Sequence, residues 1–468
     1  MSNLLASLRS SANALDAVVQ ATGVTQNNIA NAGTAGYAKQ RVSLQARPFD
    51  PDNGLAGGVQ FGPLQSARDQ YVERSVRTQN AKTTHSETRS TTLTRLEQVL
   101  RLSSGDSVPA ALNKFYAAVS AWAVAPDDPA TRDNVLTAGG GVAMAFHGIT
   151  QELDTIVAEN GTELQSVVDR VNRLAEQIRE YNVAIRRGFA GDAGVDAGIH
   201  ATLDELSADI DVQAVRQDDG TFTLLLDGQH PLVMGEDQYD LKLSFEIPAG
   251  VPRPGSTPRA TIRVGSGPED RTSVIDGGRL GALLSFRHGA LAEVNGDVTQ
   301  KGEVERLAEK IVERLNHSWP PPGPAFMVAG ASPMSIARTL QMNPALSAAM
   351  LDALDPGPPP VANGKALQMA KLANPGSDED KLDGLSFSSF FGKIASNVGT
   401  QLNDANFDRQ SQTHLMAQAQ AFRDQISSVS LDEEALYMLE FQRAYEASAR
   451  IVTVLDEMLQ TAVNIGRG

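Results

Sequence analysis

The sequence contains no cysteine, which excludes disulfide bridges, cysteine-ligated zinc sites and thiol nucleophiles. Aromatic residues make up only 5% of the 468 residues, and no apolar run approaches the roughly 18 residues of a membrane span. Positive charge is also scarce, because 40 Lys and Arg stand against 56 Asp and Glu, for a net charge of −16. Since phosphate contacts need a basic surface, this balance argues against a nucleic-acid scaffold. The first residues lack a basic head and an unbroken apolar core, so we expect no cleaved secretory signal.

Catalytic and metal-binding patterns are missing as well. No phosphate-binding Gly-x-x-x-x-Gly-Lys run is present, and the glycine triplet at 139–141 predicts a flexible turn. The acidic residues at 378–383 have the wrong spacing for a calcium loop and indicate a solvated loop. No two histidines have the four-residue spacing of a helical zinc site; they are His85, His147, His200, His230, His288, His317 and His414. We therefore expect no enzyme activity, no metal site and no cofactor.

The N-terminal segment predicts an amphipathic helix of low charge. Leu4, Leu8 and Leu15 recur at helical spacing, and residues 1–38 hold only two formal charges. The stretch 22–37 is rich in Asn, Gly, Thr and Ala, which favours a loop. Low charge means that the segment can be buried against a partner without ionic cost.

The C-terminal segment predicts a second, longer helix. Ser430 and Glu433 have the spacing of a capping box, and apolar residues then recur three, four or seven residues apart. About 35 residues at 1.5 Å each make a rod of roughly 50 Å. A rod of that length cannot bury its apolar stripe inside a small globule. It needs a partner, and the N-terminal helix is the candidate within the chain.

The interior of the chain combines helical seams with a short β segment. Residues 153–185, 280–315 and 394–426 carry apolar residues in a three-four rhythm that is typical of coiled-coil-like packing. Residues 239–247 alternate strictly between apolar and polar, and residues 221–234 indicate a hairpin. The predicted fold class is mainly α with a β insert: an elongated helical bundle whose terminal helices form a coiled-coil assembly domain.

Composition and periodicity divide the chain into successive segments. They are an N-terminal assembly helix and loop that is disordered in the monomer (1–50), the first part of a helical bundle (51–210), a β-rich inserted domain (211–276), the second part of the bundle with Pro-rich loops (277–426) and a C-terminal assembly helix (427–468).

Motifs at the two ends resemble a known family. Residues 26–32 read Gln-Asn-Asn-Ile-Ala-Asn-Ala and are followed by Gly36 and Tyr37; residues 441–450 and 456–459 form a matching C-terminal signature. This pair of motifs, in this order, resembles the flagellar rod, hook and hook-associated proteins. Further stretches are similar to the hook-associated branch that joins the hook to the filament: 37–42, 111–119, 126–132, 277–287 and 429–435.

The resemblance implies an extracellular structural part of the bacterial flagellum, located at the hook–filament junction. It also implies export by the flagellar type III apparatus without a cleaved signal peptide. The partners it implies are further copies of the chain in a helical ring, hook protein, hook-associated protein 3, a cytoplasmic export chaperone and, indirectly, flagellin and the filament cap, with no nucleic acid and no membrane. The alternative is another axial protein, such as hook-associated protein 3 or a flagellin-like protein.

The terminal segments are the expected assembly interface. We expect them to be unpaired in the free monomer and to become ordered when neighbouring copies enclose their apolar stripes. The residues expected to form this interface are Leu4, Leu8, Leu15, Asn27, Asn28, Ile29, Asn31, Gly36, Tyr37, Leu431, Phe441, Tyr445, Ala449, Val452, Leu455, Met458 and Leu459.

Overall fold

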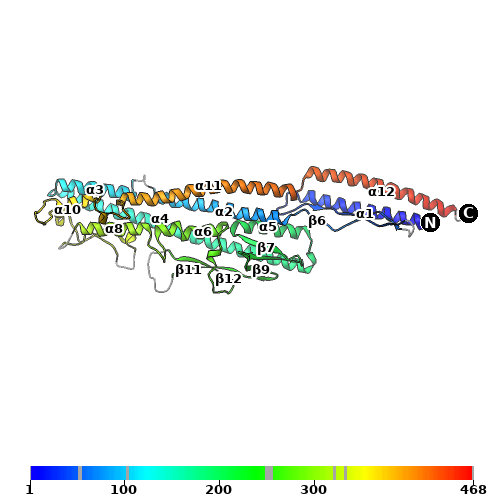
Figure 1. The fold of residues 1–468 in the computed structure, drawn as a ribbon, viewed down its shortest axis with the longest axis horizontal. Helices are drawn as coiled ribbons and strands as arrows, with labels where there is room; N and C mark the ends of the chain where they lie inside the picture. The colour runs from blue at the N-terminus through cyan, green and yellow to red at the C-terminus, as the bar shows by residue number, and fades with distance from the viewer. Residues whose placement is uncertain are drawn as a thin grey trace.

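The molecule is an elongated rod with a narrow two-helix extension at one end (Figure 1). It is known from a computed structural model that describes residues 2–50, 55–101, 105–247, 257–319, 323–330 and 335–465. The two Pro-rich stretches that the sequence predicts as loops are 320–324 and 356–360. Residues 320–322 of the first lie outside the described part, whereas the second lies in the connection before α10 (Gly364–Lys371). We refer to the two-helix extension as the tail and to the rest as the body.

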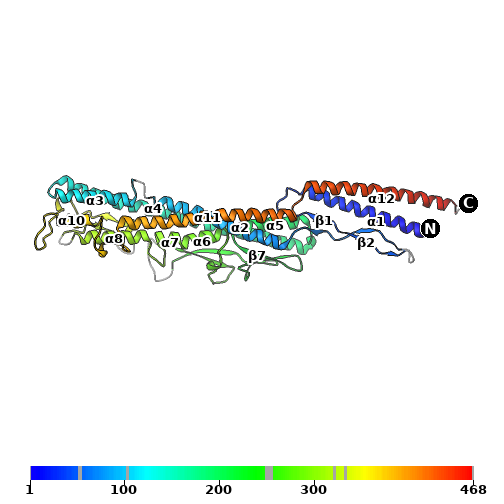
Figure 2. The same cartoon turned by 45° about the horizontal axis from the view of Figure 1, so that its top comes forward.

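The tail consists of the first and last helices of the chain. Helix α1 (Ser2–Ala30) and helix α12 (Leu431–Ile465) run antiparallel beside each other, so that both termini lie at the far end of the tail (Figures 1 and 2). The predicted C-terminal helix is confirmed, and Ser430 Oγ accepts a hydrogen bond from the backbone N–H of Glu433 at 3.4 Å, which is one of the two bonds of a capping box. The predicted loop at 22–37 is wrong in its first part, because α1 continues to Ala30.

A narrow β ribbon links α1 to the body and packs on α1. It is a series of short antiparallel pairs, each of only two or three residues per strand. The pairs are β1 (Gln40–Arg41) with β6 (Gln65–Ser66), β2 (Leu44–Ala46) with β5 (Val59–Phe61), and β3 (Phe49–Asp50) with β4 (Leu55–Ala56). The ribbon runs from residue 40 to residue 66 and so extends across the domain boundary that we predicted at residue 50.

Helices that range from 4 to 56 residues make up most of the body. They are α2 (Gln70–Val99), α3 (Val108–Val124), α4 (Pro129–Ala184), α5 (Ala193–Asp209), α6 (Gly278–His288), α7 (Ala290–Asn295), α8 (Glu303–His317), α9 (Ile336–Thr339), α10 and α11 (Phe387–Ser427). Helix α11 packs along α2, and α4 runs through both cores of the body. The glycine triplet at 139–141 lies inside α4, so the predicted turn is wrong.

The first core fills the end of the body farthest from the tail. It combines the distal halves of α2, α4 and α11 with α3, α7, α8 and α10. Its largest fully buried side chains are aromatic: Phe115, Trp122, Phe146, Phe326, Phe387, Phe390 and Phe391. The small strands β13 (Met327–Val328) and β14 (Gln341–Met342) pair at its edge.

The second core lies nearer the tail and contains the β segment. Strands β7 (Val212–Arg216), β8 (Phe222–Leu226), β9 (His230–Met234) and β10 (Asp237–Gln238) form one antiparallel sheet, and β11 (Leu241–Glu246) pairs with β12 (Arg259–Val264). The predicted strands are therefore present. Their apolar faces pack on α4, α5 and α6 rather than only on one another.

The run at 280–315 is broken where the sequence placed glycines. Helix α7 ends at Asn295, and the next residue, Gly296, has a φ of 86°, which lies in the left-handed region. A Cβ on Gly302 would lie 2.4 Å from the backbone N of Gly296, so the chain doubles back tightly before α8. The three-four spacing of apolar residues is present, but it is divided among three short helices, α6, α7 and α8, instead of one.

Candidate functional site

The tail carries two apolar stripes, and the residues that the structure describes cover only one of them. On α12, half-buried residues recur three and four apart on the side that packs on α1: Met438, Phe441, Ala444, Ser448, Val452, Leu455, Leu459 and Ala462. This is coiled-coil spacing, as the sequence predicted. Glu434 is the only fully buried residue of α12, and the buried residues of α1 are small or polar except for Val18, so the pairing of the two helices creates only a small apolar core.

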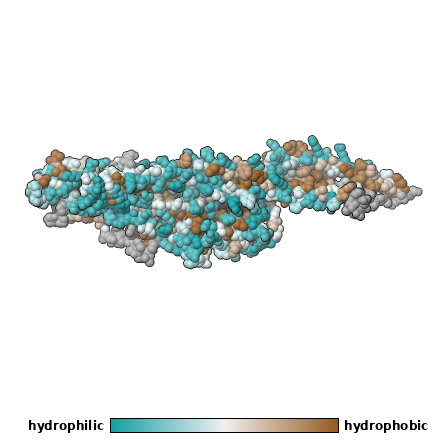
Figure 3. Space-filling model, viewed as in Figure 1, coloured by the Kyte–Doolittle hydropathy of each residue, from teal (hydrophilic) through white to brown (hydrophobic). Residues whose placement is uncertain are grey.

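The second stripe of α12 faces solvent. Its members keep the same heptad spacing but are shifted by one residue toward the N-terminus. The second stripe therefore lies about 100° around the helix from the first. They are Tyr437, Ile451, Val454, Met458 and Ile465, between 49% and 76% exposed. Brown apolar surface accordingly gathers over the tail in Figure 3. We call these five residues the open stripe.

The tail meets the body in a polar joint centred on Asn28. This side chain is 2% exposed and accepts hydrogen bonds from the backbone N–H of Gln40 at 2.9 Å and from the Tyr37 hydroxyl at 2.9 Å. Its Nδ2 donates to the Gln40 carbonyl at 3.0 Å and to Glu434 Oε1 at 3.1 Å. One asparagine thus connects α1, the ribbon and α12.

Two further contacts fasten the same joint. The Lys39 ammonium lies 3.1 Å from Glu433, and the Lys39 backbone N–H donates to the Ser427 carbonyl at 2.9 Å. Since Ser427 ends α11 and Glu433 lies in the first turn of α12, the ribbon holds the two C-terminal helices at their break. We refer to Asn28, Tyr37, Lys39, Gln40 and Glu434 as the joint.

Gly36 and Arg68 attach the joint to the body. Gly36 has a φ of 71°, and a Cβ there would lie 2.3 Å from the Ala197 carbonyl oxygen, so only glycine fits against α5. The Gly36 carbonyl accepts a hydrogen bond from Arg68 at 2.5 Å. The same guanidinium bonds Glu73 at 2.9 Å, which joins the ribbon to α2.

The structure divides the predicted interface residues into three environments. In the joint or beside it lie Asn27, Asn28, Ile29, Asn31, Gly36 and Tyr37. Half-buried in the tail lie Leu4, Leu8, Leu15, Phe441, Ala449, Val452, Leu455 and Leu459. Exposed lie Leu431, Tyr445 and Met458.

Some residues in the joint and beside it could not be recognised from the sequence. Glu434 looked like one of several charges at a helix start, yet it is 4% exposed and accepts from Asn28. Gln40 contributes through its backbone, and Arg68 stands alone in the sequence without any motif. Only a three-dimensional contact across 406 positions distinguishes Glu434 from its neighbour Glu433.

The joint is expected to weaken in strong alkali because of Tyr37. Burial, and to a lesser extent the negative charge of Glu434, raise the pKa of Tyr37 to about 12 from 10.0. A raised pKa in the folded state contributes stability that is complete below pH 10 and is lost as the pH rises toward 12. The thermal midpoint of the wild type should therefore approach that of Tyr37→Phe across this window. A constant difference between the two proteins from pH 8 to pH 12 would contradict this.

The described part shows neither a metal cluster nor a membrane helix. Within it, no group of three or more His, Asp or Glu side chains is placed to hold a metal ion. None of its helices combines the length and the apolar character needed to cross a bilayer.

Comparisons with known proteins agree with the terminal motifs. The family model "Flagellar hook-associated protein FlgK helical domain" matches residues 93–318, and "Flagellar basal body rod FlgEFG protein C-terminal" matches residues 423–465. Flagellar hook-associated protein 1 of Bacillus subtilis is 24% identical over 99% of this chain and 99% of its own length. The protein of the same name in Salmonella typhimurium is 26% identical over 61% of this chain and 52% of its own length.

One solved structure is also similar. The flagellar hook junction protein FlgK from Burkholderia pseudomallei overlaps 55% of this chain and 47% of that chain, with a TM-score of 0.47 and 20% sequence identity. The sequence matches, rather than this partial overlap, identify the family.

A tail built from both ends of the chain, with the N-terminal motif at its joint and the C-terminal motif along α12, defines an axial structural protein of the bacterial flagellum. Within that class, the chain belongs to the family of flagellar hook-associated protein 1.

Proposed function

We propose that this chain forms the junction between the flagellar hook and filament, by assembling on the distal end of the hook through its tail. The observation that carries the proposal is the open stripe. Apolar side chains at heptad spacing on a solvated helix predict a further helical partner, and none in the described chain covers them. Neighbouring copies in a ring provide such helices.

The family supports the wider setting of this proposal. Its members are flagellar structural proteins, and we infer that this chain likewise acts by assembly rather than by catalysis or with a cofactor. In this role it contacts the hook protein on one side and hook-associated protein 3 on the other, with flagellin and the filament cap farther out. It reaches this extracellular position by type III export without a cleaved signal, with a cytoplasmic chaperone shielding its C-terminal region.

The tail is expected to be loosely ordered in the free subunit. Helices α1 and α12 bury few side chains between them, and isolated helices without tertiary packing are marginal in water. Hydrogen exchange on dilute monomer should show weak protection over residues 4–30 and 435–463, highest next to the joint, against strong protection in the cores. Strong, uniform protection of both tail helices would contradict ordering on assembly.

A deletion strain tests the function itself. Cells that lack this chain should build complete hooks, form no filaments and release flagellin into the medium, because the junction is missing. The full chain should restore filaments. A chain that ends before Val452 should yield a folded, soluble body that cannot restore them, since the open stripe and the first stripe are both shortened. Filaments assembled by the truncated chain would overturn the proposal.

A further inference from the structure

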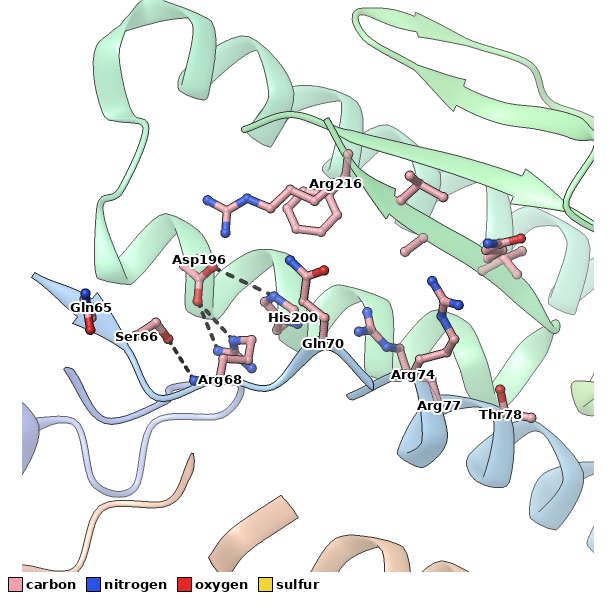
Figure 4. Close-up of a pocket in the computed structure, with 15 residues that line it drawn as sticks. Gln65, Ser66, Arg68, Gln70, Arg74, Arg77, Thr78, Asp196, His200 and Arg216 are labelled. Carbon is pink, nitrogen blue, oxygen red and sulfur yellow. Dashed lines mark hydrogen bonds and ion pairs between the residues drawn. The ribbon is translucent and has the colours of Figure 1, made fainter. Parts of the chain in front are cut away.

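A basic cavity lies in the body just beyond the joint. It has a volume of about 460 Å³ and lies between α2, α5 and strand β7. Arg74 and Arg77 project from α2 on one wall, and Arg216 comes from β7 on the facing wall (Figure 4). His200 of α5 also lines it. This concentration of guanidinium groups contrasts with a chain whose net charge is −16.

The positive charge in this cavity is only partly balanced. Arg68, at its edge, is paired with Glu73 at 2.9 Å and with Asp196 at 3.1 Å. Arg74, Arg77 and Arg216 make no ion pair with any residue that the structure describes. The cavity therefore keeps three cationic side chains available to a ligand.

Two buried nitrogen atoms beside the cavity also lack a hydrogen-bond partner. Arg77 donates through Nε to the Glu73 carbonyl at 3.2 Å, but its buried Nη1 has no hydrogen-bond partner among the described residues. His200 is 4% exposed, and its Nδ1 is likewise without a partner there. A buried donor left unpaired costs about 1–3 kcal/mol, so such groups call for an explanation. An acceptor inside the cavity satisfies the Arg77 guanidinium, and His200, whose Nε2 lies 3.8 Å from Asp196, stands beside it.

We propose that this cavity is an oxyanion-binding site, which takes a phosphate or carboxylate group between Arg74, Arg77 and Arg216 with His200 beside it. A planar guanidinium presents paired N–H donors that match the oxygens of such groups. Three of them in one cavity with a neighbouring imidazole favour a group that carries negative charge on several oxygens. No ligand of neutral chemistry accounts for the same set.

The oxyanion can come from two sources. One is a free anion in the surrounding medium. The other is an acidic side chain of a second copy, a source that rests on the self-association proposed above. Helix α12 offers exposed carboxylates for that purpose, such as Glu440 and Glu446, which form no ion pair among the described residues.

Calorimetric titration of the dilute full-length chain with inorganic phosphate, at low and constant ionic strength, tests the site. Arg74→Gln and Arg216→Gln alter exposed side chains, and each should weaken binding about tenfold, the equivalent of one lost charged hydrogen bond. Arg77→Gln should weaken it further, but Arg77 is largely buried, so the two exposed variants carry the test if Arg77→Gln does not fold. Arg187→Gln, an exposed arginine of the same body outside the cavity, is the matched control and should bind like the wild type. Absence of binding, or equal binding by all variants, would overturn the proposal.

The resonances of His200 give a second readout. Burial, together with Arg68, Arg77, Arg216 and Arg423, lowers the pKa of His200 well below its usual range. A bound anion opposes the repulsion from these arginines, so phosphate should raise the pKa of His200 while the signal of His288, which lies outside the cavity, stays fixed. A His200 signal that does not change when phosphate is added would contradict binding in this cavity.

The source of the anion is resolved by raising the protein concentration without added phosphate. The His200 signal can then shift in the same direction as it does with phosphate, and added phosphate can weaken the self-association of the chain. If both occur, a neighbouring copy supplies the carboxylate. If only added phosphate moves the signal, the ligand is a free anion. Either result supports the site, and failure of the junction role would leave the phosphate titration of the monomer unaffected. Movement that persists in Arg74→Gln and Arg216→Gln would overturn it.

Discussion

Replacing Ile451, Val454 and Met458 together with aspartate should abolish assembly and leave the monomer folded. These members of the open stripe are 52%, 49% and 53% exposed, so the free subunit loses no buried contact when they change. In an assembly that covers the stripe, three carboxylates must instead be desolvated against apolar neighbours, which costs several kcal/mol for each unpaired charge. The measurements are filament formation in a deletion strain and the thermal midpoint of the purified variant.

The matched control adds the same charge to another face of α12. Gln442, Thr453 and Gln460 are also exposed, and they lie roughly 150° around the helix from the centre of the open stripe. Their triple replacement with aspartate should retain substantial assembly. If the open-stripe variant builds filaments as well as this control does, the stripe is no interface. If its body unfolds, the stripe has a role within the subunit that its exposure does not reveal.

Patterns that depend on neighbouring residues were predictable from the sequence. The stripe of α12 and its capping box predicted a helix at Leu431–Ile465, and strict alternation predicted β11. Such periodicities report burial on one face of an element, which is set by residues a few positions apart. The terminal motifs identified the family for a different reason, because they match as whole stretches of sequence and have no period.

Features that depend on tertiary contacts were not predictable in the same way. The segment from Thr22 to Ala30 has the composition of a loop, but burial of Thr25 and Asn28 against other elements keeps it helical. Gly139 lies inside α4, where Met342 packs against the helix. A Cβ at position 139 would lie 2.4 Å from Met342 Sδ, so the tertiary contact and not a turn accounts for this glycine. Strands of two or three residues, as in the ribbon, are too short to show alternation.

The candidate site shows the same division. The apolar residues of the two tail helices, such as Leu4 and Leu459, were predicted from their spacing alone, and Asn28 was predicted from its motif. The sequence expected that asparagine to satisfy backbone groups in the loop and across subunits. The structure shows it bonding Glu434, at the start of the other tail helix, and no periodic signal links two residues so far apart in the chain.

Substituting Asn28 with alanine should uncouple the two tail helices at the joint. The change removes four hydrogen bonds and leaves the Glu434 carboxylate, 4% exposed, without its amide partner. An unpaired buried group of this kind costs about 2–3 kcal/mol, equivalent to a loss of roughly 30-fold or more in protection from hydrogen exchange. The loss should appear in the residues next to the joint, on both α1 and α12, and filament assembly should fall with it.

Two companion variants separate the joint from general effects on α1. Asn31→Ala removes an asparagine of the same motif that bonds only near the helix end, so it should change protection by no more than a few-fold. Glu434→Gln keeps an oxygen that can accept from Asn28 and removes the buried charge, and should therefore be milder than Asn28→Ala. If Asn28→Ala and Asn31→Ala have equal effects, the motif stabilises the end of α1 alone, and the connection to α12 contributes nothing.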